Sequence, residues 1–259
     1  MITLHTIIYE GNYEEYLKKD SRFFTLQNEL ITKKLITVNN VTDIENCNKL
    51  LNELKSLYDF DVIYVDDHCD KTKDFFNLVM DETTAGYFYS IPIFVGFLNT
   101  TTPFIFHLSS DCLNNNLTIT DDFLTKSIDV LGNDDDELIV TTIGDEKQPW
   151  SVAGVPPEVP NKSMTCVGEW EQINTANYKP ENELKDWWCS DCISDNIFLG
   201  NIKKLKKANY NLRNLARFAG PAYGGTASFE YRMAQHLVAA GVYRLIYRNS
   251  NCAHQHIAH

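Results

Sequence analysis

The sequence contains no long hydrophobic run, and it has no excess of basic residues. None of its apolar stretches reaches the roughly 20 residues that a membrane-spanning helix needs, so no transmembrane segment is expected. Its 23 Lys and Arg residues are outnumbered by 35 Asp and Glu residues, which gives a formal net charge of −12. A nucleic-acid surface needs clustered Lys and Arg, so no nucleic-acid partner is expected. An anionic nucleotide ligand is still possible, because a metal ion can supply positive charge locally.

The sequence does not predict a secretion signal at its start. The first residues, MITLHTIIYEGNY, lack a basic start and soon become acidic. Seven cysteines without such a signal are typical of a reducing compartment with mostly free thiols. We therefore expect a cytoplasmic protein.

Apolar and amphipathic segments alternate along the first 145 residues. Short apolar runs predict strands at 2–9, 34–41, 61–67, 103–110 and 137–144. Apolar residues at helical spacing predict helices at 42–58, 71–100 and 121–131, the first with Thr42 or Asp43 as its N-cap. This alternation predicts an α/β fold with a mainly parallel central sheet and helices on both faces.

Three of the predicted strands end in polar side chains. The ends read NNVTD from Asn39, VDDH around Asp66 and Asp67, and SSDC from Ser109. Ligands of open α/β sheets bind at the carboxyl ends of the strands, so the three ends predict one binding crevice. For any one of these residues, ordinary turn or N-cap chemistry is an alternative.

Residues 148–190 are rich in Trp and Pro and show no clear periodicity. Such a segment is either a small irregular subdomain or a binding loop whose indoles form a wall for a sugar-like acceptor. Order returns with a predicted strand at 192–201 and a basic helix after it. Glycines at 220, 224 and 225 then precede a predicted helix at about 229–240 and a last strand at 242–247.

Taken in order, these segments resemble a nucleotide-sugar-dependent glycosyltransferase with the GT-A fold. The opening strand TLHTIIYEGN is similar to the first strand of that family, and Ser109-Ser110-Asp111 stands where the family has its Asp-X-Asp motif. Phe229-Glu230 within GGTASFE resembles the Glu-Asp pair that carries the catalytic acid. The terminal Cys-Ala-His-Gln-His resembles the late His that completes a metal site. The first acid of Asp-X-Asp is replaced by Ser here, and the order of the motifs covers nearly the whole chain.

The resemblance implies one domain over residues 1–259, with a nucleotide-sugar-binding half at 1–145 and an acceptor-binding half at 146–259. It implies transfer of a sugar from a nucleoside-diphosphate sugar, in first place a UDP-sugar, to a glycan or another hydroxyl acceptor with inversion. The implied donor-binding residues are Tyr9, Asn39, Asn40, Asp66, Asp67, Ser109, Ser110 and Asp111. An enzyme of bacterial polysaccharide synthesis or of a large virus would fit, which places it in the cytoplasm of a bacterium or of an infected host cell.

The chemistry of sugar transfer suggests roles for further residues. A divalent cation, Mn or Mg, neutralises the charge that develops on the diphosphate, and Asp111 with His254 or His256 could bind it. The acceptor hydroxyl needs a base, for which Glu230 is the first candidate and Asp195 or Asp191 the second. Trp187 and Trp188 are the candidates for the acceptor wall. For Glu230, an acid that only complements a helix dipole is the alternative.

Two alternatives come from other functional classes. Cys189 and Cys192 have CxxC spacing, and Cys252 with His254 and His256 could complete a structural zinc site in an interaction module. A non-catalytic sugar-binding module would use the Trp-rich loop without chemistry. The His-rich end could also belong to a larger protein with further domains.

Overall fold

The computed structural model describes residues 1–84, 86–110, 119–132, 140–145, 162–164, 170–172, 187–190, 197–211, 229, 232–233, 236–237, 244–247 and 253–254. The strands are β1 Ile2–Ile8, β2 Ile31–Val38, β3 Asp61–Tyr64, β4 Phe104–Leu108, β5 Val140–Asp145, β6 Lys162–Met164, β7 Trp170–Gln172, β8 Trp187–Ser190, β9 Ile197–Asn201, β10 Arg244–Tyr247 and β11 Ala253–His254. The helices are α1 Tyr13–Tyr16, α2 Arg22–Thr25, α3 Ile44–Lys55, α4 Val65–Phe76, α5 Tyr87–Asn99, α6 Asp121–Leu131 and α7 Ile202–Leu205.

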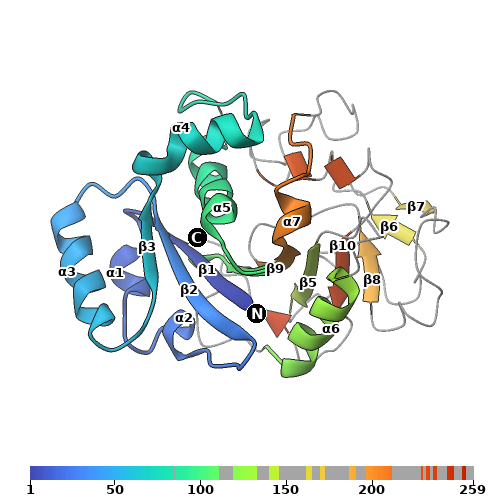
Figure 1. Ribbon diagram of the computed structural model, residues 1–259, viewed down its shortest axis with the longest axis horizontal. Helices are drawn as coiled ribbons and strands as arrows, with labels where there is room; N and C mark the ends of the chain where they lie inside the picture. The colour runs from blue at the N-terminus through green and yellow to red at the C-terminus, as the bar shows by residue number, and fades with distance from the viewer. Residues whose placement is uncertain are drawn as a thin grey trace.

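Nine of the described strands form one sheet, in the order β3-β2-β1-β4-β9-β5-β10-β8, with β11 beside β5 (Figure 1). β3, β2, β1 and β4 are parallel to their neighbours, as are the pairs β5–β10 and β5–β11. β9 runs antiparallel between β4 and β5, and β8 is antiparallel to β10. The predicted α/β class with a mainly parallel sheet is therefore confirmed. Strands from both predicted halves of the chain join this sheet, while the division into donor and acceptor halves stays a prediction.

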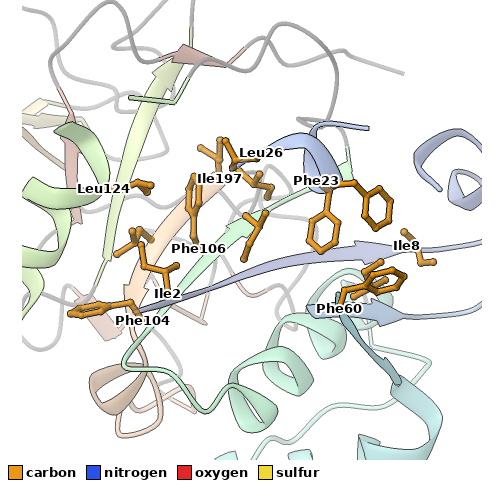
Figure 2. Close-up of a cluster of buried hydrophobic side chains, with 14 of the residues drawn as sticks. Ile2, Ile8, Phe23, Leu26, Phe60, Phe104, Phe106, Leu124 and Ile197 are labelled. Atoms are coloured by element: carbon orange, nitrogen blue, oxygen red, sulfur yellow. The ribbon is translucent and has the colours of Figure 1, made fainter. Parts of the chain in front are cut away.

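Helices cover both faces of the sheet, and each face has its own hydrophobic cluster. The α3 face, which carries α1, α2, α3 and α6, buries a cluster in which Phe23, Leu26 and Leu124 lie with Ile2, Ile8 and Phe106 of the strands (Figure 2). The α5 face, which carries α4, α5, α7 and the helical residues 229, 232–233 and 236–237, buries a second cluster that includes Phe94, Phe97, Ile105, Phe198 and Phe229. Because side chains alternate along a strand, β1, β3, β4 and β9 each contribute to both clusters.

Local sequence signals explain where the main helices begin. Asp43 caps α3 by accepting a hydrogen bond from the Asn46 backbone N–H at 3.1 Å, and Thr120 caps α6 through the N–H of Phe123 at 3.2 Å. Asn77, with φ at 51°, ends α4 in the left-handed region that Asn tolerates. The helices described are all too short or too polar to cross a membrane.

The structure corrects one strand end. The predicted strand 61–67 stops at Tyr64, and Val65 already begins α4. Asp66 and Asp67 therefore lie in the first turn of a helix, where acidic side chains complement the helix dipole, and both are exposed.

Candidate functional site

A cavity of about 300 Å³ lies at the carboxyl edge of the parallel strands. Its walls come from the ends of β1, β2 and β4 and from the first turns of α5. The lining residues are Ile7, Tyr9, Asn39, Asn40, Phe88, Tyr89, Ile93, His107, Ser109 and Ser110. Parallel pairing brings these strand ends together, since Ile8 is in register with Val38 and His5 with His107. Five of the predicted donor-site residues thus share one cavity: Tyr9, Asn39, Asn40, Ser109 and Ser110.

The amide of Asn39 fastens the end of β2 to α5. Its Nδ2 donates a hydrogen bond to the Phe88 carbonyl at 2.7 Å, and the side chain is buried. The next residue, Asn40, has φ at 50°, a conformation that Asn adopts more readily than most residues. These two asparagines form the turn that leads the chain away from the cavity.

Asn12 connects the other two strand ends, and sequence reasoning missed it. Its Oδ1 accepts a hydrogen bond from the Tyr9 backbone N–H at 2.9 Å, and its Nδ2 donates to Ser110 Oγ at 2.6 Å. Both Asn12 and Ser110 are buried. The bridge holds the loop after β1 against the end of β4, and Asp111 follows Ser110 directly in the sequence.

The aromatic wall of the cavity was also missed. Phe88 and Tyr89 lie in the first turn of α5 and keep 42% and 71% of their surface exposed, although both line the cavity. Exposed aromatic rings in a cavity wall are groups on which a heteroaromatic ligand can stack. The aromatic triplet Tyr87-Phe88-Tyr89 after Gly86 was the signal in the sequence that could have indicated this wall.

A row of buried polar side chains crosses three strands beneath α5. His107 Nδ1 lies 2.9 Å from His5 Nδ1, and His5 Nε2 lies 2.8 Å from Thr37 Oγ1. All three side chains are buried, and His107 also lines the cavity. Burial, and then the charge of His107, lower the pKa of His5 well below its usual range, so the His5 ring is neutral.

Gly96 of α5 allows the helix to lie directly on this row. A Cβ atom at residue 96 would come within 2.5 Å of His5 Cε1 and 2.6 Å of His5 Nε2. The absence of a side chain at residue 96 is therefore required by the position of the His5 ring.

The remaining predicted site residues are not brought to the cavity by the described part of the chain. Asp66 and Asp67, in the first turn of α4, are not among its lining residues. Trp187, on β8, is only 4% exposed and packs against Tyr247, so its indole has little surface left for an acceptor. The residues that lie outside the described part, wholly or with their side chains, are Asp111, Trp188, Asp191, Asp195, Glu230, His254 and His256.

The described residues contain no group of three His, Cys, Asp or Glu side chains that could hold a metal ion. The predicted cation ligands lie outside those residues, so their fit to Mn or Mg stays a prediction. The same holds for the alternative zinc site, because Cys192 and Cys252 are not described and Cys189 is described only in its backbone on β8. Cys47 and Cys69 are free thiols, as expected.

No protein-family model and no curated protein sequence matches the chain. Among solved structures, the fold is similar to that of GalNAc-T7 crystallised with UDP, GalNAc and Mn²⁺, with a TM-score of 0.57 and 9% identity over 100% of this chain and 44% of that one. S. aureus TarS has a TM-score of 0.47 and 12% identity, over 98% of this chain and 59% of that chain. Glucosyl-3-phosphoglycerate synthase from Mycobacterium tuberculosis, solved with Mg²⁺ and UDP, has a TM-score of 0.42 and 10% identity. That match covers 78% of this chain and 57% of the synthase chain.

The chain spans less than two thirds of each of these three proteins. At such low identity, the likeness to GalNAc-T7 concerns the fold, and it agrees with the order of strands and the position of the cavity. The protein has the GT-A fold, which is the fold of nucleotide-sugar-dependent glycosyltransferases.

Proposed function

We propose that the protein is a glycosyltransferase that moves a sugar from a UDP-sugar to a hydroxyl group of a glycan or another acceptor. The observation that carries this proposal is the cavity at the carboxyl edge of β1, β2 and β4, in a sheet of the GT-A type. Its volume of about 300 Å³ is at the lower end of the range for small-molecule sites.

The lining suits the nucleoside part of such a donor. Tyr9, Phe88 and Tyr89 offer rings for a base, and Ile7 and Ile93 offer an apolar floor. The amides and hydroxyls at the strand ends can hydrogen-bond to the polar edge of the base or to the ribose. In this arrangement the diphosphate extends past Ser109 and Ser110 towards Asp111.

A divalent cation, Mn or Mg, belongs to the proposal, with Asp111 and either His254 or His256 as its ligands. When bound, the cation neutralises the charge that develops on the departing diphosphate. The proposal of Asp111 is supported by its place in the sequence, directly after Ser110, which lines the cavity and accepts a hydrogen bond from the Asn12 amide.

Glu230 is the proposed general base, which favours an inverting reaction, and Asp195 or Asp191 is the second candidate. Phe229, which precedes Glu230 in the sequence, is helical and buried. Its backbone N–H donates a hydrogen bond to Ser90 Oγ in α5 at 2.6 Å. Because the first turns of α5 line the cavity, this bond ties the segment around Glu230 to the helix that forms the donor wall. Trp188 remains the proposed acceptor contact.

Thermal unfolding in the presence of UDP-glucose, UDP-galactose, UDP-N-acetylglucosamine and GDP-mannose, each with and without Mn²⁺, tests the proposal. A ligand at one hundred times its dissociation constant adds about 2.7 kcal/mol to the free energy of unfolding. We expect this gain from at least one UDP-sugar with Mn²⁺, and its loss in Asp111→Asn. Asp129→Asn, an exposed acid on α6, is the matched control.

The base is tested separately. Glu230→Gln should bind the donor normally, while transfer to an acceptor falls by about a hundredfold or more. If no nucleotide-sugar stabilises the protein, the proposed function is wrong. Normal turnover by Glu230→Gln would move the role to Asp195 or Asp191.

A further inference from the structure

Helix α5 contains a proline close to the turns that line the cavity. Pro92 lies inside the helix, which begins at Tyr87, and it is buried. In a regular helix the N–H of residue 92 donates to the carbonyl of residue 88, about one turn earlier. Proline has no N–H, and its ring also crowds that carbonyl. The Phe88 carbonyl therefore lacks its usual helical donor.

Asn39 supplies the replacement donor. Its side-chain Nδ2 donates a hydrogen bond to the Phe88 carbonyl at 2.7 Å. Asn39 directly follows β2, and its backbone N–H donates to the Ile8 carbonyl of β1 at 3.0 Å, so the amide projects from a fixed point. A backbone carbonyl that is withdrawn from water needs a donor. The proline in α5 and the amide after β2 thus compensate for each other.

This hydrogen bond holds a residue whose ring lines the cavity. The Phe88 ring, with Tyr89 next to it in the sequence, forms part of the aromatic wall. A bond to the backbone carbonyl of Phe88 fixes the point from which the ring projects and leaves the ring itself uncovered by that bond. Pro92 is not among the described residues that line the cavity, so it can influence a ligand only through α5.

A second hydrogen bond holds the same stretch of α5. Ser90 Oγ accepts from the Phe229 backbone N–H at 2.6 Å, and both residues are buried. The Phe229 ring stacks on Phe198 of β9 with 5.4 Å between the ring centroids. Residues 88–90 are therefore bonded to β2 through one atom and to the segment around Phe229 through another.

We propose that Pro92 is a positioning residue for the donor site, because it leaves the Phe88 carbonyl to the Asn39 amide and so orders the aromatic wall before a ligand binds. A wall that is already ordered avoids the entropy cost of ordering its side chains during binding. Pro92 acts through the backbone of Phe88 and does not contact the ligand. This inference rests on the proposed function, because it concerns the wall of the same donor site.

The decisive variant is Pro92→Val, tested by titration calorimetry with UDP and Mn²⁺. Valine adds the missing N–H and keeps most of the apolar volume of the proline ring. The Phe88 carbonyl can then bond within the helix, and the Asn39 amide has to compete for it. We expect the dissociation constant for UDP to rise by about threefold to tenfold, which corresponds to the cost of ordering one or two side chains.

Ile91→Val is the matched control. Ile91 is a fully buried neighbour of Pro92 in the same helix, and it is not among the described residues that line the cavity. Its replacement by valine also changes buried volume but supplies no new N–H, so the UDP affinity should stay unchanged. An unchanged affinity in Pro92→Val, or an equal loss in Ile91→Val, overturns the inference.

Hydrogen exchange of the Asn39 side-chain NH₂ group, followed by NMR without any ligand, tests the competition directly. Exchange should be at least about tenfold faster in Pro92→Val than in the wild type, because the amide spends less time bonded to the Phe88 carbonyl. An unchanged exchange rate would refute the inference.

A double-mutant cycle with Asn39→Ala supplies the last readout. Asn39→Ala should itself weaken UDP binding, and adding Pro92→Val should cause little further loss, because no amide is left to compete. Losses that multiply would refute the inference. If neither UDP nor any nucleotide-sugar binds the wild type, the proposed function and this inference both fail, whereas unchanged affinity in Pro92→Val refutes this inference alone.

Discussion

The two faces of the sheet treat neighbouring residues of the same strand in opposite ways. On β4, Phe106 points to the α3 face and packs against Phe123, while His107 points to the α5 face and contacts His5. On β1, Leu4 likewise lies on the α3 face and His5 on the α5 face. Near the cavity the α5 face therefore carries a hydrogen-bonded polar row under its helix, whereas the same strands bury mainly apolar side chains on the α3 face, with Thr6 as a polar exception. The alternation of side chains along a strand lets one face bury a mainly apolar cluster while the other face contributes to the lining of the cavity.

The largest effect should come from breaking the α3 face. Phe106→Ala removes a fully buried ring and should lower the free energy of unfolding by about 3–5 kcal/mol, measured by chemical denaturation. Donor affinity per folded molecule should stay unchanged, because the ring faces away from the cavity. A loss of affinity at a temperature where the variant is folded would show that the two faces are coupled.

A smaller effect is expected where α5 lies on the polar row. Gly96→Ala places a methyl group against the His5 ring and should cost about 1–3 kcal/mol of folding free energy, together with a loss of donor affinity. Gly200→Ala is the control, because its Cβ would meet Leu205 Cδ1 at the same 2.5 Å. The end of a leucine can move aside, so Gly200→Ala should cost less and leave affinity intact. Equal costs would mean that the His5 ring is not held in place.

The amide of Asn39 should show its effect in binding. Asn39→Asp replaces the NH₂ group that donates to the Phe88 carbonyl with an oxygen that repels it. We expect donor affinity to fall by about ten- to a hundredfold, measured by calorimetry. Asn52→Asp, at an exposed position of α3, is the control. Unchanged affinity in Asn39→Asp would show that the hydrogen bond between Asn39 and the Phe88 carbonyl does not contribute to donor binding.

The smallest effect concerns a charge on the α3 face. Burial lowers the pKa of Lys34 from 10.5 to about 8, with its amine donating to the Phe24 carbonyl at 2.7 Å. Between pH 8 and 10.5 the unfolded chain binds this proton more strongly than the folded protein, so the contribution of Lys34 to the free energy of unfolding rises with pH. Because the side chain is only half-buried, we expect a rise of about 1 kcal/mol or less.

Denaturation of the wild type and of Lys34→Met across this pH range measures the effect. Lys34→Met should remove this rise, and Lys33→Met, an exposed neighbour on β2, should retain it. If the free energy of unfolding changed with pH by the same amount in all three proteins, the assignment to Lys34 would be contradicted.

The sequence predicted the elements whose signals are local. The helix predicted at 121–131 is α6, and the predicted strands 2–9 and 34–41 largely coincide with β1 and β2, because their periodicity and caps lie within the segments themselves. The predicted end of β3 was wrong because the signal there is ambiguous. Asp66 and Asp67 fit a strand end or a first helical turn equally well by type, and only the position of α4 decides between them.

The cavity was partly predictable, since polar strand ends can be read in the sequence and parallel strands gather them. The antiparallel insertion of β9 between β4 and β5, the burial of Trp187 and the Thr37–His5–His107 row could not be read there. These features depend on which residues meet across strands about 30 to 100 positions apart, and no local pattern encodes that pairing. The bridge from Asn12 was invisible for the same reason.

The Asn12–Ser110 bridge also dictates when the cavity can exist during synthesis. It joins residues 98 positions apart, and β4 must insert beside β1 before the two strand ends can meet. While a ribosome has released only the first hundred residues, β1, β2 and α5 can associate, but the wall that contains Ser109 and Ser110 is absent. A nascent chain therefore acquires its ligand site only after β4 has emerged, and a fragment that ends before residue 104 should fail to bind any donor.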